Sequence, residues 1–362
     1  MIIIHQKEHR ELNGLKIKRN TAAFTGILIF IFMLVFAEEF RKGFSAGLIN
    51  CAETVIPSLF PFLIAASLAG RNEFSPKVAG YVSRVTEFLF GLPCECLSAI
   101  ILGQLGGYLS GAKSAQSLRA SGRISCRQAE KLMLFCVNPG IGFTVNALGS
   151  IMLSSRGSGR IIFAAVCISA FICGVISRFL PCEKHNADVI KIKYPTLSEA
   201  IVGSVSSGTL SILTACAFIC LFSGITSVID AYVTNENIRL AAICLLEITN
   251  GCVYASKEMS LPFISAICAF GGLCVHMQIF AVSDNFKIRF LRFYLFRVLH
   301  AILAFAVCSL ILRLFPDARQ VMVNITPEAA LWSFSAPASV SMLFLSALLI
   351  LDLDNIYKVW YD

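Results

Sequence analysis

The stretch IRLAAICLLEITNGCVYASK (238–257) constrains the fold most strongly, because it places Glu247 inside an apolar run and follows it with Asn250 and Gly251. A charge near the centre of a bilayer costs about 2.5 to 3.5 kcal/mol on insertion scales, so this carboxylate needs a partner, a proton or a water-filled site. Broken helices at membrane depth persist only where protein or a polar cavity surrounds them. The stretch therefore predicts a broken element inside a membrane protein.

The composition of the whole chain indicates the same class. Of its 362 residues, 57% are hydrophobic and 14% are charged, and the mean hydropathy is +0.76. One soluble domain could not keep that much apolar surface out of water. Runs of roughly 20 apolar residues, enough to cross ~30 Å of hydrocarbon, recur along the chain. We expect an all-α polytopic membrane protein with about eight transmembrane helices, near residues 24–40, 46–70, 130–153, 160–180, 206–230, 260–283, 293–315 and 336–352.

The first apolar segment, about Thr25 to Ala37, ends in AEEF without a small-residue cleavage site, so we expect an anchor and not a signal peptide. The 15 cysteines lie mostly in apolar runs, where thiols behave as small hydrophobes. The sequence has no zinc-type CxxC pair, P-loop or GxSxG motif. We expect no metal, no cofactor and no enzymatic activity. Among the residues of the chain, Cys94, Glu95 and Cys96 come nearest to a cluster of reactive side chains.

Two apolar segments fit simple spans badly, namely 238–257 and FGLPCECLSAIILGQLGGYLSGAK (90–113), which carries Pro93 and five glycines. Three basic clusters set their expected topology, because Lys and Arg collect on the cytoplasmic side. The clusters are Lys7, Arg10, Lys16, Lys18 and Arg19; Lys113, Arg119, Arg123, Arg127 and Lys131; and Lys287, Arg289, Arg292 and Arg297. All three are cytoplasmic, together with the N-terminus, only if both segments are re-entrant. The outer loops then keep eight of the 30 Lys and Arg: Arg41, Lys42, Arg156, Arg160, Arg239, Lys257, Arg313 and Arg319.

This topology predicts an inverted repeat. Residues 46–153 run span, broken element, span from outside inward, and residues 200–283 run the same order from inside outward. Paired broken helices in corresponding positions of two inverted halves point to a substrate site at the bilayer midplane. The predicted units are 1–45 (cytoplasmic N-terminus and first anchor), 46–153 (first repeat), 154–200 (connecting span and cytoplasmic loop), 201–283 (second repeat) and 284–362 (C-terminal spans).

Polar residues and glycines of the broken elements form the predicted solute site: Glu247, Thr249, Asn250, Gly251, Gly107, Tyr108, Ser110, Gly111, Asn138, Pro139, Gly272 and His276. Each has a structural alternative. Glu247 either serves the solute or is a protonated acid bonded to a facing helix, and His276 either contacts the solute or makes one interhelical hydrogen bond. Asn138 and Pro139 either expose backbone groups to a ligand or only kink a helix. The neutral groups of the first element favour a hydrogen-bonded solute over a strongly charged one.

The basic loop 113–131 contains a capping-box pattern, Ser125 with Gln128, which predicts a helix start. The loop either rests on anionic lipid headgroups or acts only as a topology determinant. We expect no nucleic-acid partner, because the basic residues are divided among membrane loops and lack interleaved aromatic residues.

Two signatures resemble a known family. GGYLSGAKSAQSLRASGRISCRQAEKLMLFCVNPG (106–140) resembles the central signature of the YlbJ-type sporulation integral membrane proteins, a branch of the nucleoside-recognition or Gate-domain membrane families. LLEITNG (245–251), AFGGLCVHMQ (269–278) and RFYLFRVLHAILA (292–304) resemble its second-half signature. Two positions depart from the pattern: Leu109 stands where the family usually has Pro, and Val137 stands where it has Asn.

The resemblance implies a Gate-type inverted-repeat membrane fold, with residues 46–153 and 201–283 as Gate-like repeats, and a role in forming the spore envelope and cortex. The first functional hypothesis is a transporter or permease for a small solute, located in the bacterial cell membrane. The second is a non-transporting assembly or scaffold factor that binds other sporulation membrane proteins, and the residues at 109 and 137 favour it slightly. The expected partners are the lipid bilayer, the solute and such proteins.

Overall fold

A computed structural model of the chain describes residues 24, 26–69, 76–181, 196–283 and 289–315. Within these ranges every regular element is a helix, so the prediction of an all-α chain is confirmed for this part. Five helices are long and apolar enough to cross a membrane: Ala37–Ala65, Arg156–Ser177, Leu197–Tyr232, Leu261–Val282 and Phe290–Leu314. They make the chain a membrane protein.

The predicted boundary between the first two spans was wrong. Residues 41–45, expected as an outer loop, are helical, and α2 (Ala37–Asn50) continues through the π-helical η1 (Cys51–Val55) into α3 (Ile56–Ala69). Lys42 bonds to Glu38, one turn earlier, at 2.7 Å. This i,i+4 pair supports a solvated helix where charge counting expected a loop. The predicted span 336–352 lies outside the described residues.

The remaining helices fall into two halves whose order of elements agrees in part. After α3 come α4 (Pro76–Phe90), α5 (Cys96–Leu105), α6 (Tyr108–Ala120), α7 (Cys126–Met133), the π-helical η2 (Gly142–Met152) and α8 (Arg156–Ser177). The second half comprises α9 (Leu197–Tyr232), α10 (Glu236–Leu246), α11 (Ile248–Glu258), α12 (Leu261–Phe270), α13 (Gly272–Val282) and α14 (Phe290–Leu314). Each half contains two pairs of short helices with a long helix after them, but α4, which precedes the first pair in the first half, has no counterpart in the second.

The first pair of short helices in each half folds back on itself. We call residues 96–120 (α5 and α6) the first hairpin and residues 236–258 (α10 and α11) the second hairpin. In the first, a Cβ built on Gly111 would lie 2.9 Å from the Cα of Gly103, and Gly107 makes the turn with φ +98°. In the second, a Cβ on Gly251 would lie 2.8 Å from the Cα of Cys244.

The second pair of short helices in each half is an interrupted helix. We call residues 126–152 the first broken span, in which 134–141 separate α7 from η2. Residues 261–282 are the second broken span, where left-handed Gly271 (φ +89°) alone separates α12 from α13. The capping box at the start of α7 is confirmed, because Ser125 and Gln128 exchange both hydrogen bonds.

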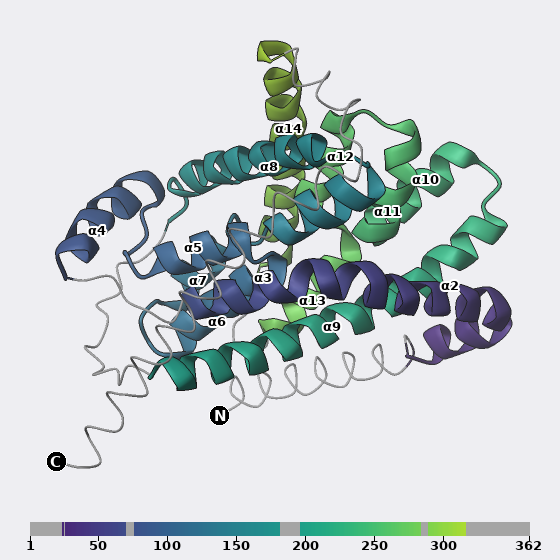
Figure 1. The fold of residues 1–362 in the computed structure, drawn as a ribbon, viewed down its shortest axis with the longest axis horizontal. Coiled ribbons are helices and arrows are strands. Elements are labelled where there is room, and N and C mark those ends of the chain that lie inside the picture. Colours follow the sequence, from purple (N-terminus) through teal and green to yellow (C-terminus); the bar gives the residue numbers. More distant parts are fainter. Residues whose placement is uncertain (1–23, 25, 70–75, 182–195, 284–288, 316–362) are drawn as a thin grey trace, which may run out of the picture.

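Long helices flank these elements (Figure 1). Helix α9 packs along α2 and α3 at the lower edge of the view, while α8 runs along the upper edge and packs against α12 and α14. The hairpins and broken spans lie between these edges, so the interrupted backbone is surrounded by protein, as a membrane interior requires.

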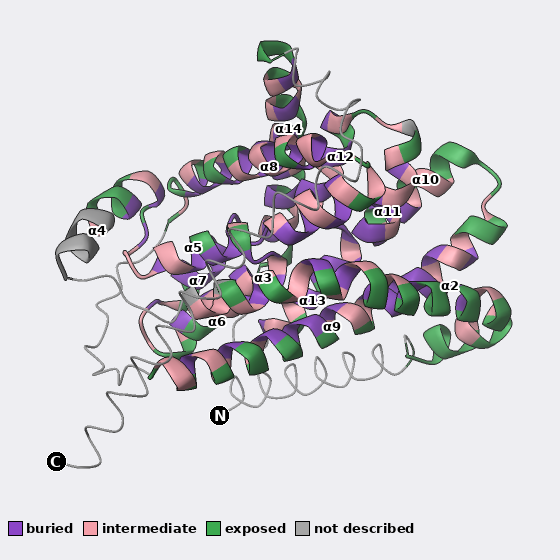
Figure 2. Ribbon diagram, in the orientation of Figure 1, coloured by how far each residue is buried: buried purple, intermediate pink, exposed green. Residues whose placement is uncertain are grey.

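The distribution of side chains suits a lipid environment (Figure 2). Large apolar side chains are exposed on the outer faces of the long helices, including Ile168, Phe171, Leu210, Leu213, Leu295 and Ile302. Ionisable side chains are fully buried at Glu247, Arg297 and His300. An apolar exterior around polar interior groups is the pattern of a membrane bundle.

One basic residue was assigned to the wrong environment. Arg297, counted with a cytoplasmic cluster, is 1% exposed inside α14. Arg289 and Arg292, from the same cluster, lie 4.0 and 3.8 Å from a carboxylate oxygen of Glu130 on α7. Because Glu130 belongs to the second basic segment, the starts of α7 and α14 lie on one side of the molecule.

Candidate functional site

The tips of the two hairpins face one small cavity of about 60 Å³, which we call the tip cavity. The first hairpin contributes Gly106 to Leu109, and the second contributes Glu247, Ile248 and Thr249. The broken spans contribute Pro139, Gly140, Phe143, Val275 and Gln278, and apolar residues of η1, α3 and α9 complete the wall. Two elements that are more than 100 residues apart in the sequence therefore meet at one site.

Glu247 is the single residue between α10 and α11. Its extended backbone (φ −141°, ψ 120°) ends the first helix, and its side chain caps the second. The N–H groups of Thr249 and Asn250 donate to its two carboxylate oxygens at 2.9 and 2.6 Å. These bonds and the helix N-terminus offset part of the cost of burying a carboxylate. The expected bond to a facing helix is absent among the described residues, and Glu247 binds its own helix instead.

Tyr108 connects the first hairpin to the other half of the molecule. Its hydroxyl donates to the carbonyl oxygen of Cys268 in the last turn of α12, and its ring lies against Gly271, where a Cβ would come within 3.3 Å of it. The helix that Tyr108 begins has no side-chain cap at Gly107. The N–H of Ser110 donates to the carbonyl oxygen of Gly107, whereas the N–H groups of Tyr108 and Leu109 have no partner among the described residues and are available as donors.

Each break in a broken span packs against one hairpin tip. A Cβ on Gly140 would lie 2.6 Å from both the amide nitrogen of Gly107 and the carbonyl oxygen of Leu105. A Cβ on Gly272, whose φ is +72°, would lie 3.2 Å from the carbonyl oxygen of Leu246. Only glycine permits so close an approach of two backbones at the first contact.

Arg297 on α14 bonds to both broken spans. Its guanidinium donates to the carbonyl oxygens of Val137 at 2.6 Å and Leu134 at 2.9 Å in the first broken span. A longer bond, 3.4 Å, reaches Ala269 in the second. Carbonyl groups freed by the interruptions thus receive donors from a buried cation, which satisfies backbone groups that lipid could not.

The predicted site residues divide into two groups. Five of them line the tip cavity: Gly107, Tyr108, Pro139, Glu247 and Thr249. Asn250 instead donates to the hydroxyls of Ser223 and Thr226 on α9 at 3.0 and 3.1 Å. The other predicted residues that do not line the cavity are Ser110, Gly111, Asn138, Gly251, Gly272 and His276.

The side chains of Asn138 and His276 each make one hydrogen bond within their own broken span. The Asn138 amide donates to the carbonyl oxygen of Phe135 at 2.7 Å. Nε2 of His276 is bonded to the carbonyl oxygen of Phe270 at 2.8 Å, and its ring packs edge-on against Phe270, Phe293 and Tyr294. The other polar atom of each side chain, Asn138 Oδ1 and His276 Nδ1, is buried without a hydrogen-bond partner among the described residues, so both alternatives for these residues stay open.

Sequence reasoning missed Gln278, Gly106 and Gly140 as cavity residues and Arg297 as their support. Gln278 and Gly140 stand inside the interrupted stretches and could have been found from that position. For Arg297 the available sequence signal is the apolar residues on both sides of it. They indicate a position inside a helix, and α14 does continue from Phe290 to Leu314.

The groups at the tip cavity are a carboxylate, a phenol, a primary amide, the Thr249 hydroxyl and backbone N–H groups. Such groups bind and orient a polar ligand. Within the described ranges, no three His, Cys, Asp or Glu side chains gather in a way that could hold a metal ion. No family model, curated protein or solved structure matches the sequence.

Proposed function

We propose that the chain is a Gate-type transporter or permease for a small polar solute, held between the tips of the two hairpins. The observation that carries this proposal is the shared cavity, to which hairpins from both halves contribute polar groups, chiefly Glu247 and Tyr108. Interrupted helices around a buried polar site are the architecture by which secondary transporters bind solutes near the bilayer midplane.

In this proposal the two halves form an inverted repeat and the chain crosses the membrane about eight times, with both hairpins re-entrant. The order of helices supports the repeat in part, because the halves agree except for α4. The contact of Glu130 with Arg289 and Arg292 supports a common side for the second and third basic clusters, which we assign to the cytoplasm together with the N-terminus. The resemblance of the sequence signatures to sporulation membrane proteins supports a location in the cell membrane during endospore formation.

The described conformation is closed around the site. A cavity of about 60 Å³ is well below the ~300 to 1,000 Å³ of usual ligand pockets. Binding a solute therefore requires the hairpin tips to separate. Because Gly140 and Gly272 hold each tip against a break in a broken span, opening moves a hairpin relative to these glycines.

A solute screen with matched carboxylate variants tests the function. Purified protein is heated with each member of a library of small polar solutes, and the rise in melting temperature is measured. Glu247→Gln keeps one acceptor oxygen for the cap of α11 but removes the negative charge from the cavity. Glu53→Gln is the control, because Glu53 is exposed on η1 and does not line the cavity. We expect one solute class to stabilise the wild type and Glu53→Gln, with the effect lost in Glu247→Gln. Equal stabilisation of all three proteins would contradict the proposal.

The second candidate function is a non-transporting assembly or scaffold factor. It is favoured by the side chains at positions 109 and 137, where the sequence departs from the family pattern. Leu109 lines the tip cavity with an aliphatic group, and Val137 is fully buried. Under this hypothesis the closed site never opens, and spore formation depends on the outer faces of the protein. A chain that binds no solute but co-purifies with a defined membrane partner from sporulating cells would support it.

A further inference from the structure

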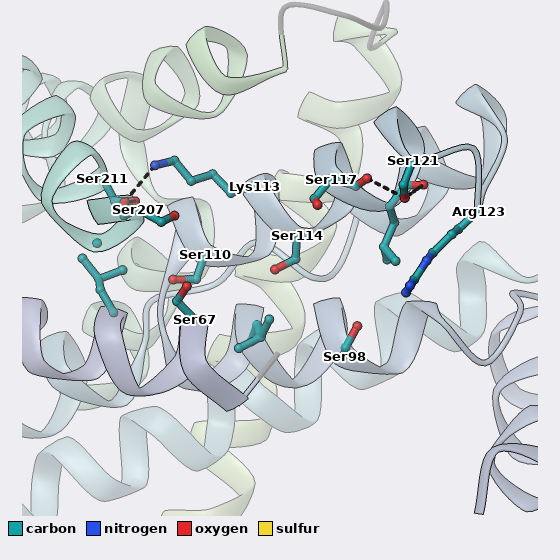
Figure 3. Close-up of a pocket in the computed structure, with 14 residues that line it drawn as sticks. Ser67, Ser98, Ser110, Lys113, Ser114, Ser117, Ser121, Arg123, Ser207 and Ser211 are labelled. Carbon is teal, nitrogen blue, oxygen red and sulfur yellow. Dashed lines mark hydrogen bonds between the residues drawn. The ribbon is translucent and has the colours of Figure 1, made fainter. Parts of the chain in front are cut away.

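A second and larger cavity lies beside the first hairpin. It has a volume of about 380 Å³, and we call it the serine cavity because eight serines line it (Figure 3): Ser67, Ser98, Ser110, Ser114, Ser117, Ser121, Ser207 and Ser211. They come from α3, α5, α6, the turn after α6 and α9. Leu63 lines this cavity and the tip cavity, so the two are neighbours. The volume falls within the range of ordinary ligand pockets.

Half of these hydroxyl groups have no hydrogen-bond partner in the part of the chain that the structure describes. Ser98, Ser110, Ser121 and Ser211 donate to backbone carbonyls of their own segments. Within the described part of the chain, no hydrogen bond is made by the hydroxyls of Ser67, Ser114, Ser117 and Ser207. Four donors are therefore available at the cavity wall, of which Ser67, Ser114 and Ser207 are half-buried and Ser117 is exposed.

Two cations stand at opposite ends of the serines (Figure 3). Lys113 is half-buried on α6, and its ammonium donates one hydrogen bond to the carbonyl oxygen of Ser207 at 3.1 Å. An ammonium has three N–H donors, so two remain for a ligand. Arg123 enters from the turn after α6. No Asp or Glu lines the cavity, and no carboxylate of the described residues pairs with Lys113.

We propose that the serine cavity binds a phosphate group, with Lys113 and Arg123 neutralising its charge and the unpartnered serine hydroxyls donating to its oxygens. A phosphate monoester carries about −1.5 to −2 charge and three strong acceptor oxygens, which matches two cations and four hydroxyl donors. A neutral solute would leave the Lys113 ammonium, which has no carboxylate partner among the described residues, without a counter-charge in a partly buried site. The phosphate belongs either to a soluble compound or to the headgroup of an anionic lipid, and this site does not depend on whether the chain moves a solute.

Two binding measurements distinguish the sources. In the first, protein in a non-ionic detergent is titrated with inorganic phosphate and with glycerol 3-phosphate, against chloride at equal ionic strength. In the second, native mass spectrometry measures retention of phosphatidylglycerol, with diacylglycerol as the lipid without phosphate. Binding in the first measurement alone identifies a soluble phosphate, and retention in the second alone identifies a headgroup. Either result supports the site, and binding in neither overturns it.

Variants locate the binding. Lys113→Gln keeps an N–H donor for the carbonyl of Ser207 but removes the charge, and we expect a loss of affinity of about tenfold or more. Lys113→Arg should retain binding. The matched control is Lys257→Gln, because Lys257 is exposed on α11 outside the cavity. If Lys113→Gln binds phosphate and lipid as tightly as Lys257→Gln, the assignment is wrong.

A second variant covers the case in which Lys113→Gln fails to fold. The double change Ser114→Ala and Ser117→Ala removes two hydroxyls that have no partner in the described protein, so folding should be unaffected. We expect several-fold weaker phosphate binding in this variant. Unchanged affinity would mean that these hydroxyls do not contact the ligand and would overturn the proposed donor set.

Discussion

The hydroxyl group of Tyr108, at the tip of the first hairpin, donates a hydrogen bond to the carbonyl oxygen of Cys268 on the second broken span. This bond crosses between the two halves of the molecule beside the tip cavity. Any separation of the hairpin tip from the second half must break or move it. The bond therefore contributes to the stability of the closed conformation.

Tyr108→Phe removes this bond and should lower the free energy of unfolding by about 0.5 to 1.5 kcal/mol. The control is Tyr294→Phe, because the hydroxyl of Tyr294 makes no hydrogen bond among the described residues. Both are measured by thermal denaturation in detergent. A drop in melting temperature confined to Tyr108→Phe is expected, and equal melting temperatures would show that the cross-half bond contributes nothing.

Arg297→Met should destabilise the protein by about 2 kcal/mol or more, since a buried carbonyl left without its donor costs ~1 to 3 kcal/mol. The carbonyls of Leu134 and Val137 would both lose their guanidinium donor. Arg313→Met, at an exposed position of the same helix, is the comparison. Thermal denaturation of the two variants measures the difference, and a similar loss in both would contradict the role of Arg297 in holding the breaks.

Gly140→Ala places a Cβ 2.6 Å from backbone atoms of Gly107 and Leu105, which cannot rotate away. The expected cost is about 1 to 3 kcal/mol, as for other overpacked interiors. Gly157→Ala on α8 is the matched substitution, because its nearest neighbour would be a serine oxygen at 3.8 Å. That change should be neutral or stabilising by up to ~1 kcal/mol. Equal melting temperatures for both variants would mean that the first hairpin does not pack on the break at Gly140.

Labelling of cysteines tests the topology. Cys126 is exposed at the start of α7, and Arg289 is exposed at the start of α14. In the wild type, a membrane-impermeant maleimide should modify Cys126 only from the cytoplasmic side. In the double variant Cys126→Ala, Arg289→Cys, it should modify the introduced cysteine from the same side. Modification of Cys126 in intact cells would reject the re-entrant arrangement, and modification of the two positions from opposite sides would contradict the contact with Glu130. Cys182, which should also label from the cytoplasm, lies outside the described residues.

The sequence alone predicted the broken elements, because a buried carboxylate and clustered glycines are local signals. Glu247 and Gly107 do stand at the turns of the two hairpins. Arg297 was misplaced because charge counting treats any arginine near the end of a span as part of a loop. Its partners are backbone carbonyls at the breaks in the two broken spans, more than 25 residues away in the sequence. These contacts depend on tertiary packing, which local sequence does not reveal.

The serine cavity shows the same limit. Ser110, Ser114, Ser117 and Ser121 follow helical spacing along α6 and the turn after it, and this stripe is visible in the sequence. Nothing local indicates that serines from α3, α5 and α9 face the stripe, or that Lys113 turns toward Ser207. Local sequence predicts polar faces, whereas the pairing of faces requires the fold.

A substitution that fills the tip cavity without altering a polar group tests most directly whether a solute binds between the hairpin tips. Ala215 on α9 is buried and lines the cavity, whereas Ala217, two residues further along the same helix, is exposed. The measurement is the dissociation constant of the stabilising solute for Ala215→Leu and for Ala217→Leu. The account predicts that Ala215→Leu loses binding while Ala217→Leu binds like the wild type. Equal binding by both variants, or no binding of any library solute to the wild type, would contradict a solute site between the hairpin tips.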